Sequence, residues 1–166
     1  MTKHEQLVWA AGFFDGEGCV NLSKPVSYGR IREDGTRAAF PWFQLQVVVC
    51  QRSRIPMDML VKVLGVGHLS GLKTHDSVYW WYRIHGNKAV AVLKKLLPYL
   101  ILKKANAELG IAFQTLVESS KTYRGAGRSP EVVATLEGFY QASKELNKRN
   151  KSMDYTKEKS GPVVVN

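Results

Sequence analysis

Two carboxylates separated by one glycine, Asp15 and Glu17, are the residues whose types and spacing most clearly suggest chemistry. They follow eight uncharged residues, Leu7 to Phe14. Carboxylates are unfavourable at the end of a helix, because the last carbonyls lack intrahelical partners and carry the negative end of the dipole. A bound cation would reverse this cost, since magnesium takes carboxylate, carbonyl and phosphate oxygens. The pair therefore indicates half of a metal site.

The uncharged run before these acids predicts a helix that has no polar face. An amphipathic helix keeps one polar side, so a helix that is apolar all round must be covered on more than one side. The small residues Ala11, Gly12 and Gly16 would let another backbone come close. We expect the helix to end at Gly16 and Gly18, since glycine readily takes the left-handed conformation of a helix terminus.

The stretch from Ala10 to Gly18 resembles the signature nonapeptide of the LAGLIDADG homing endonucleases. The positions that match outright are Ala11, Gly12, Asp15 and Gly18. Ala10 stands where the family usually has leucine, which reduces helix packing, and Glu17 keeps a carboxylate at the position of the second acid. The alternative is a buried core helix with a capping turn, so the rest of the chain has to support the resemblance.

Composition limits the partners. The 166 residues suit one domain, and 45% apolar residues are ample for a core. A net charge of +10, from 24 basic and 14 acidic residues, favours a polyanion, with nucleic acid ahead of a membrane. No apolar run approaches the ~18 residues of a spanning helix. Two cysteines, Cys19 and Cys50, are too few for a disulfide framework, so we expect a reducing intracellular compartment, cytoplasmic or organellar.

Hydrophobic patterning after the nonapeptide predicts alternating pairs of strands and helices. Strands are expected at residues 19–24, 40–51, 67–72 and 78–85, with a loop or hairpin tip at 25–39. Helices are expected at 56–64, 88–97, 105–120 and 130–147, with a loop at 123–129. The resemblance implies an α+β fold of αββαββα order with an antiparallel, saddle-shaped sheet and helices on one face. We expect one domain over residues 1–147 and a basic, flexible tail over 148–166.

The number of motifs per chain predicts the assembly. The only partial repeat, Leu136 to Ser143, places Gln141 and Ser143 where the acids should stand. One motif gives one catalytic carboxylate, whereas cutting a duplex requires an active site for each strand. We therefore expect a homodimer about a twofold axis between two copies of the first helix. The residues expected at the dimer interface are Leu7, Ala11, Gly12 and Asp15.

The resemblance implies a metal-dependent DNA endonuclease that makes a double-strand break in a long pseudopalindromic target. Glu17, its dimer mate and the carbonyl of Gly16 would bind magnesium, for which manganese could substitute. Asp15 would be mainly structural or a secondary ligand. Lys103, which ends a family-like stretch from Pro98, would stabilise developing charge, although a plain phosphate contact is a strong alternative. Gln51 would hold the water network.

Double-stranded DNA would lie along the sheet, because the major groove admits β-ribbons and presents a distinct pattern at each base pair. Amides, hydroxyls, arginines and aromatic rings on the strands and in the 25–39 loop are candidate contacts. We consider core packing the better interpretation for Trp80 and Tyr82. The candidates are Asn21, Ser23, Arg30, Arg32, Arg37, Trp42, Gln44, Gln46, Tyr79, Trp81 and Arg83.

Two other classes of function compete with this interpretation. A nucleic-acid-binding protein of the same fold, such as an intron RNA maturase or a non-cleaving regulator, would need the basic surface but not the metal site. Retention of both acids argues against complete loss of cleavage, yet leaves intron RNA open as a second partner. A zinc-dependent HNH-type nuclease would rest on the group His68, His75, His85 and Asn87, whose spacing matches no metal motif.

Overall fold

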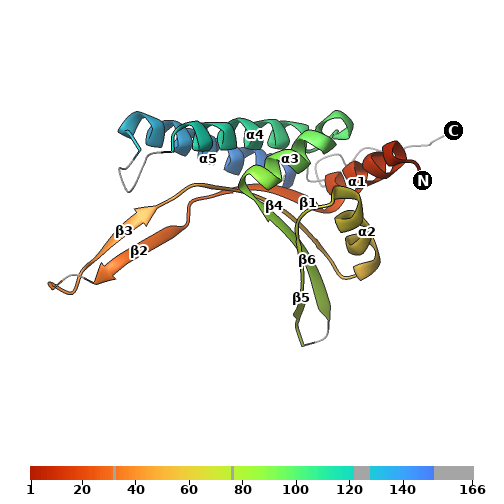
Figure 1. The fold of residues 1–166 in the computed structure, drawn as a ribbon, viewed down its shortest axis with the longest axis horizontal. Helices are drawn as coiled ribbons and strands as arrows, with labels where there is room; N and C mark the ends of the chain where they lie inside the picture. Colours follow the sequence, from red (N-terminus) through yellow and green to blue (C-terminus); the bar gives the residue numbers. More distant parts are fainter. Residues whose placement is uncertain (32, 76, 122–127, 152–166) are drawn as a thin grey trace, which may run out of the picture.

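The computed structural model describes residues 1–31, 33–75, 77–121 and 128–151. The centre of the described part is a four-stranded antiparallel sheet in the order β1-β4-β6-β5, with the helices on one face (Figure 1). The strands are β1 (Gly18–Ser23), β4 (Gln44–Gln51), β5 (His68–Lys73) and β6 (Val78–His85). The helices are α1 (Lys3–Glu17), α2 (Arg54–Leu64), α3 (Gly86–Leu96), α4 (Lys104–Ser119) and α5 (Pro130–Lys151), with a short 3₁₀ turn, η1 (Leu97–Tyr99). The expected α+β fold with helices on one face is confirmed.

Helix α1 is longer than expected and ends differently. Thr2 and Glu5 form a capping box: Thr2 Oγ1 accepts from the Glu5 N–H, and the Thr2 N–H donates to Glu5 Oε2 over 2.7 Å. The expectation of a left-handed glycine was wrong, because Gly16 lies inside the helix and Gly18 is extended, with φ −82°. Gly18 is required for another reason: a Cβ there would lie 2.2 Å from a ring carbon of Phe14.

The expected strand 40–51 is broken, and of the two alternatives expected for residues 25–39, a loop or a hairpin tip, the structure has a hairpin ribbon. Strands β2 (Val26–Ile31) and β3 (Arg37–Pro41) make a separate two-stranded antiparallel sheet that projects away from the helices (Figure 1). Pro25 and Pro41 flank the break, and the Trp42 N–H donates to the Pro25 carbonyl across it over 3.0 Å. Proline has no N–H for a strand ladder, which explains why the pairing is interrupted here.

The core lies between the sheet and the helices. Alternate residues of the central strands are buried on the helix side, and α4 comes close enough that a Cβ at Gly110 would lie 3.0 Å from Leu45 Cδ1. The predicted core packing is therefore confirmed for Tyr82, and Trp80 is half-buried against the same core. The buried strand residues are Val20, Leu22, Leu45, Val47, Val49, Tyr82 and Ile84.

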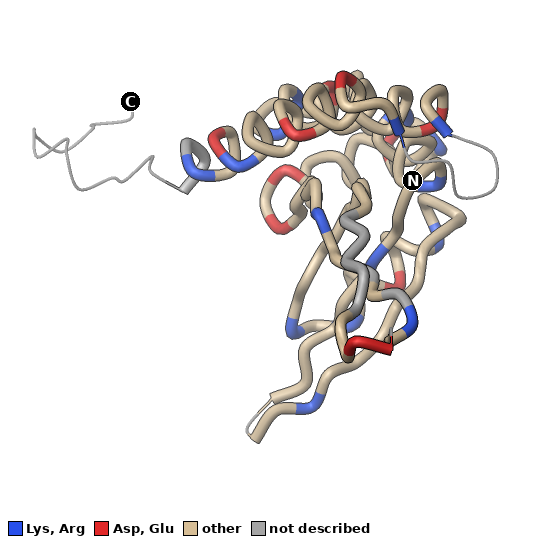
Figure 2. The backbone as a smooth tube through the Cα atoms, turned by 90° about the vertical axis from the view of Figure 1, so that its left-hand side faces the viewer, with Lys and Arg blue, Asp and Glu red and all other residues tan. Residues whose placement is uncertain are grey.

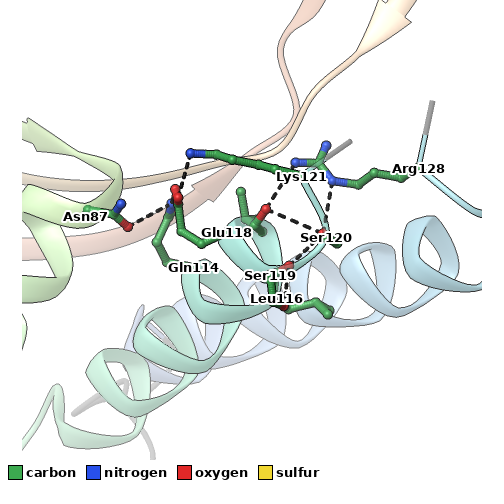
Figure 3. A network of polar contacts seen from close by, with 9 residues as sticks. Asn87, Gln114, Leu116, Glu118, Ser119, Ser120, Lys121 and Arg128 are labelled. Atoms are coloured by element: carbon green, nitrogen blue, oxygen red, sulfur yellow. Dashed lines mark hydrogen bonds and ion pairs between the residues drawn. The ribbon is translucent and has the colours of Figure 1, made fainter. Parts of the chain in front are cut away.

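A polar network lies where the start of α3, the end of α4 and the segment before α5 meet (Figure 3). Buried Gln114 donates to Glu118 over 2.9 Å and to Asn87, at the start of α3, over 3.5 Å. Arg128 Nη2 donates to the Val117 carbonyl over 3.4 Å, near the end of α4, where a cation complements the helix dipole. The side chains therefore tie α3, α4 and the segment before α5 together.

For the C-terminal part, the sequence predicted a domain end at residue 147, a loop at 123–129 and a flexible tail from residue 148. Helix α5 continues to Lys151, past the predicted domain end at Asn147. The predicted tail from 152 onward and most of the predicted loop at 123–129 lie outside the described residues. Within the described residues, every helix is too short or too polar to cross a lipid bilayer.

Candidate active site and nucleic-acid interface

Glu17 is the exposed last residue of α1, directly before the edge strand β1. Gly18, the next residue, pairs with Val49, which precedes Cys50 near the end of β4. Burial raises the pKa of the Cys50 thiol, while the positive charge of Arg83 lowers it and the negative charge of Glu17 raises it further. The charges of Arg83 and Glu17, which come from different elements, thus both reach Cys50.

Asp15 is buried and serves the fold. Its Oδ2 accepts the N–H groups of Ile101 and Leu102 over 2.7 and 3.2 Å, and its Oδ1 accepts that of Lys103 over 2.9 Å. Hydrogen bonds to a charged group contribute roughly 1.5–3 kcal/mol each, enough to hold a carboxylate near a helix end. Both oxygens are therefore occupied within the chain, which favours the structural role of Asp15 over that of a metal ligand.

Lys103 lies at the end of α1. Its Nζ donates to the Asp15 carbonyl, one of the last carbonyls of the helix. A cation here offsets the helix dipole, at a carbonyl two residues before Glu17 in the chain. Beside it is an open hollow of about 400 Å³ between β1, α4 and α5, lined by Gly18, Cys19, Val20, Asn21, Lys103, Asn106 and Asn147.

A second contact holds β1 on the other side of Glu17. Asn147, on α5, donates to the Val20 carbonyl over 3.3 Å, and its Oδ1 accepts from Asn106, on α4, over 3.0 Å. The chain is thus anchored at Asp15 before the acid and at Val20 after it. Sequence reasoning missed Asn147, since a polar residue on a long helix gives no sign of the strand edge that it caps.

Gln51 ends β4, and Arg52 follows it directly. Gln51 Oε1 accepts from the Arg52 N–H over 2.7 Å. The Arg52 guanidinium donates to the Tyr79 hydroxyl from Nε and Nη2, over 3.2 and 2.9 Å, and lies 5.2 Å from the ring centroid. Arg52 was missed by sequence reasoning; the signal was the polar run from Gln51 to Arg54 directly after an apolar strand.

The predicted polar candidates share the sheet face opposite the helices. Asn21 pairs with Gln46 and Ser23 with Gln44, and Gln46 in turn pairs with His85 on β6. Trp42 is 42% exposed at the joint with the ribbon. Tyr79, Trp81 and Arg83 follow on β6, and the Arg83 guanidinium lies 4.6 Å from the Trp81 ring centroid. The structure therefore brings these residues to one surface.

The ribbon candidates are described only in part. Arg30 is exposed on β2. Arg37 belongs to β3 and pairs with Ile31, whereas Arg32 lies outside the described residues. Lysines and arginines occur along the strands, and acidic residues occur both in the helical layer and at the tip of one hairpin (Figure 2).

The free face of α1 differs from the predicted interface. Ala11 and Asp15 are buried in the chain's own core, so they have no surface left for a second copy. Leu7 is half-buried, while Val8, Gly12 and Gly16 are exposed at helical spacing. A Cβ at Gly12 or Gly16 would meet nothing within 4 Å. The helix is therefore covered on one side and bare along a smooth strip on the other.

The oxygen groups around Glu17 fit half of a magnesium site. Among the described residues, no group of three or more histidine, cysteine and acidic side chains could hold a metal ion, which gives the HNH alternative no support. Glu17 supplies an exposed carboxylate, and Gly16 belongs to the last helical turn, where carbonyls lack intrahelical partners. These are hard oxygen donors, and one chain supplies too few of them for a complete site.

Comparisons with known proteins agree with this geometry. No family model matches the chain. The chain is 33% identical over 108 residues to DNA endonuclease I-CvuI of Chlorella vulgaris, an alignment that covers 64% of this chain and 63% of that protein. The chain thus spans less than two thirds of the length of this curated relative.

Solved structures extend the likeness to most of the chain. The homing endonuclease I-CvuI in complex with its target matches with a TM-score of 0.63 and 25% identity, over 86% of this chain and 83% of that one. The archaeal intron-encoded homing endonuclease I-Vdi141I, complexed with DNA, matches with a TM-score of 0.66 and 15% identity, over 86% and 84%. These likenesses confirm the resemblance that the nonapeptide carried.

Proposed function

We propose that this chain, which has the fold of the LAGLIDADG homing endonucleases, is a site-specific DNA endonuclease that makes a metal-dependent double-strand break. The observation that carries the proposal is the exposed Glu17 at the end of α1, beside a strand face of polar and basic residues. The relative named DNA endonuclease I-CvuI and its structure with bound target support the same activity.

Double-stranded DNA is the proposed substrate, bound along the face of the sheet opposite the helices. Amide pairs such as Asn21 and Gln46 can bond adenine edges, and hydroxyls such as Ser23 can serve as donor or acceptor. Arg30 and Arg83 are placed to contact phosphates or guanines. A net charge of +10 supplies the sequence-independent part of the affinity.

A homodimer is the proposed assembly. Each chain offers one exposed acid at the end of α1, and two strands have to be cut. The bare strip of Val8, Gly12 and Gly16 would let two α1 helices pack closely about a twofold axis. This contact would bring the two copies of Glu17 together and complete the oxygen donor set.

Magnesium is the proposed resident ion, with manganese as a substitute, and when bound it polarises the scissile phosphate and lowers the pKa of water. Glu17 and the carbonyl of Gly16 would hold it. Lys103 places positive charge next to the end of α1, where charge develops on the phosphate. Arg52, kept in place by the Tyr79 hydroxyl, would contact the DNA strand that carries this phosphate, and Gln51 would orient water.

The test uses a duplex that the protein itself selects from a random library, cloned into a plasmid. With magnesium we expect a linear product, and with chelator we expect bound but uncut plasmid. Sedimentation of the protein should give twice the chain mass. A monomer that cuts both strands would contradict the dimer, and a dimer that binds the selected site without cutting in magnesium or manganese would contradict the endonuclease. Assistance of intron RNA splicing and a reducing intracellular location stay predictions of the sequence.

A further inference from the structure

A second open hollow, of about 290 Å³, lies where β5 begins, β6 ends and α3 starts. It is separate from the hollow beside Lys103, and its lining shares none of the latter's residues. The residues that line it are Gly67, His68, Arg83, Ile84, His85 and Lys88. Only Arg83 among them was a candidate contact from the sequence.

The lining is chemically one-sided. Arg83 and Lys88 are cations, His68 and His85 can each donate from a ring nitrogen, and none of the six lining residues is acidic. Like charges gathered around a hollow repel each other, and this repulsion is relieved when an anion binds between them. The lining therefore suits a small oxyanion with several acceptor oxygens.

The groups that form the hollow are held in place by the fold. Arg83 pairs with His68 across the sheet, and its guanidinium lies against the Trp81 ring at 4.6 Å. Gly67 has φ +123° and lies under the Tyr82 ring, where a Cβ would come within 2.1 Å of a ring carbon. The Tyr82 hydroxyl donates to the Val66 carbonyl over 2.6 Å. This packing fixes the turn that places His68 at the start of β5.

The position of the hollow connects it to the proposed DNA surface. His85 pairs with Gln46, which pairs with Asn21, so one row of polar residues runs from β1 to the hollow. Arg83 lies on the same face, next to the edge strand β5. A duplex whose bases meet this row would bring its backbone towards that edge.

We propose that this hollow is a discrete binding site for one backbone phosphate of DNA. The inference rests on the proposed DNA substrate and deepens it, because it places a phosphate contact at the β5 and α3 edge of the sheet, away from the acid. Inorganic phosphate shares the ligand chemistry, but the open mouth and the continuity with the polar row favour a phosphodiester in a chain.

The experiment compares Lys88→Gln with Lys94→Gln, an exposed lysine in the last turn of the same helix. Binding of the selected duplex is measured by fluorescence anisotropy over a range of salt concentrations. Loss of one phosphate contact should lower the slope of log K against log salt by about 1 for each chain that carries Lys88→Gln, and therefore by about 2 for the proposed homodimer. Lys94→Gln should keep the wild-type slope, and Lys88→Arg should restore it.

A wild-type slope for Lys88→Gln would overturn the proposal. A second arm titrates inorganic phosphate and duplex separately while the imidazole NMR signals of His68 and His85 are followed. We expect duplex to shift both signals at micromolar concentration and phosphate to require far more. Saturation by phosphate without any response to duplex would assign the hollow to a free anion and overturn the DNA contact. A protein that shows the slope change but never cuts would contradict only the endonuclease proposal.

Discussion

Asp15 and Glu17 are two residues apart in the chain but have different surroundings. Asp15 is turned into the fold, where three backbone N–H groups saturate its oxygens. Glu17 is exposed directly before β1, where its charge reaches Cys50. The first acid therefore fixes the end of α1 against the segment that carries Lys103, and the second is left for chemistry.

Cys50 offers a test of this arrangement that needs no DNA. Only the thiolate reacts with iodoacetamide, so a raised pKa slows alkylation at a given pH. Glu17→Gln removes a charge that raises the Cys50 pKa and should speed alkylation, whereas Arg83→Gln removes a charge that lowers it and should slow alkylation. Peptide mass spectrometry at pH 8 reads the rate at Cys50. Equal rates in both variants and the wild type would show that these charges do not act on the thiol.

At the scale of elements, α1 has one face in the core and one bare face. The uncharged sequence of α1 predicted that two sides of the helix are covered, but Ala11 was assigned to the dimer interface instead of the core. Apolar periodicity cannot say which side of a helix faces the chain's own sheet. The spacing of Thr2 and Glu5 fits a capping box, but the sequence prediction started the helix at Leu7 instead of Lys3. Only the exposure of Val8, Gly12 and Gly16 in the structure identifies the free strip.

Gly12→Leu tests that strip. A leucine fits the protomer, since a Cβ there meets nothing within 4 Å, and it should improve helix propensity by roughly 0.8–1 kcal/mol. It would prevent close approach of a second α1, so sedimentation should give a folded monomer. The matched control is Gly138→Leu, at an exposed glycine of α5 with equally open surroundings, which should remain dimeric. A dimeric Gly12→Leu protein would remove the strip from the interface.

The anchors around Glu17 also act at this scale. Asn147→Ala removes the donor to the Val20 carbonyl, so the free energy of unfolding should fall by about 1–2 kcal/mol. We expect single-turnover cleavage to slow while duplex affinity stays near the wild-type value, because β1 is loosened beside the acid. Gln141→Ala, an exposed change on the same helix, serves as the control. Unchanged cleavage by Asn147→Ala would leave this contact a purely structural one.

Local pattern predicted most of the central fold, and long-range contacts account for what it missed. The core position of Tyr82 was predicted, and the bounds of β6 were as predicted. The break at Pro41 was missed because the alternation of Trp42 and Phe43 continues across it. Arg52 and Asn147 were missed because their partners, Tyr79 and Val20, are distant in sequence.

At the scale of the whole molecule, chemistry and assembly depend on the same helix. In the proposed function the basic net charge would attract the duplex, the strand face would contact its bases, and the end of α1 would supply the acid. A single chain holds one exposed acid in that position, so the proposed double-strand break would need two chains. The bare strip of α1 and Glu17 would then both lie at the proposed twofold axis.

The most direct measurement is cleavage of the selected duplex in magnesium by Glu17→Gln, with duplex affinity measured on the same preparation. Loss of a metal ligand should slow the reaction by more than about a hundredfold, since even second-shell partners are worth 10–100-fold. Affinity should stay within about threefold of the wild type, because the salt-dependent phosphate contacts are intact. Glu108→Gln, an exposed change on α4, should cut normally. Double-strand cleavage at the wild-type rate by Glu17→Gln would contradict the account.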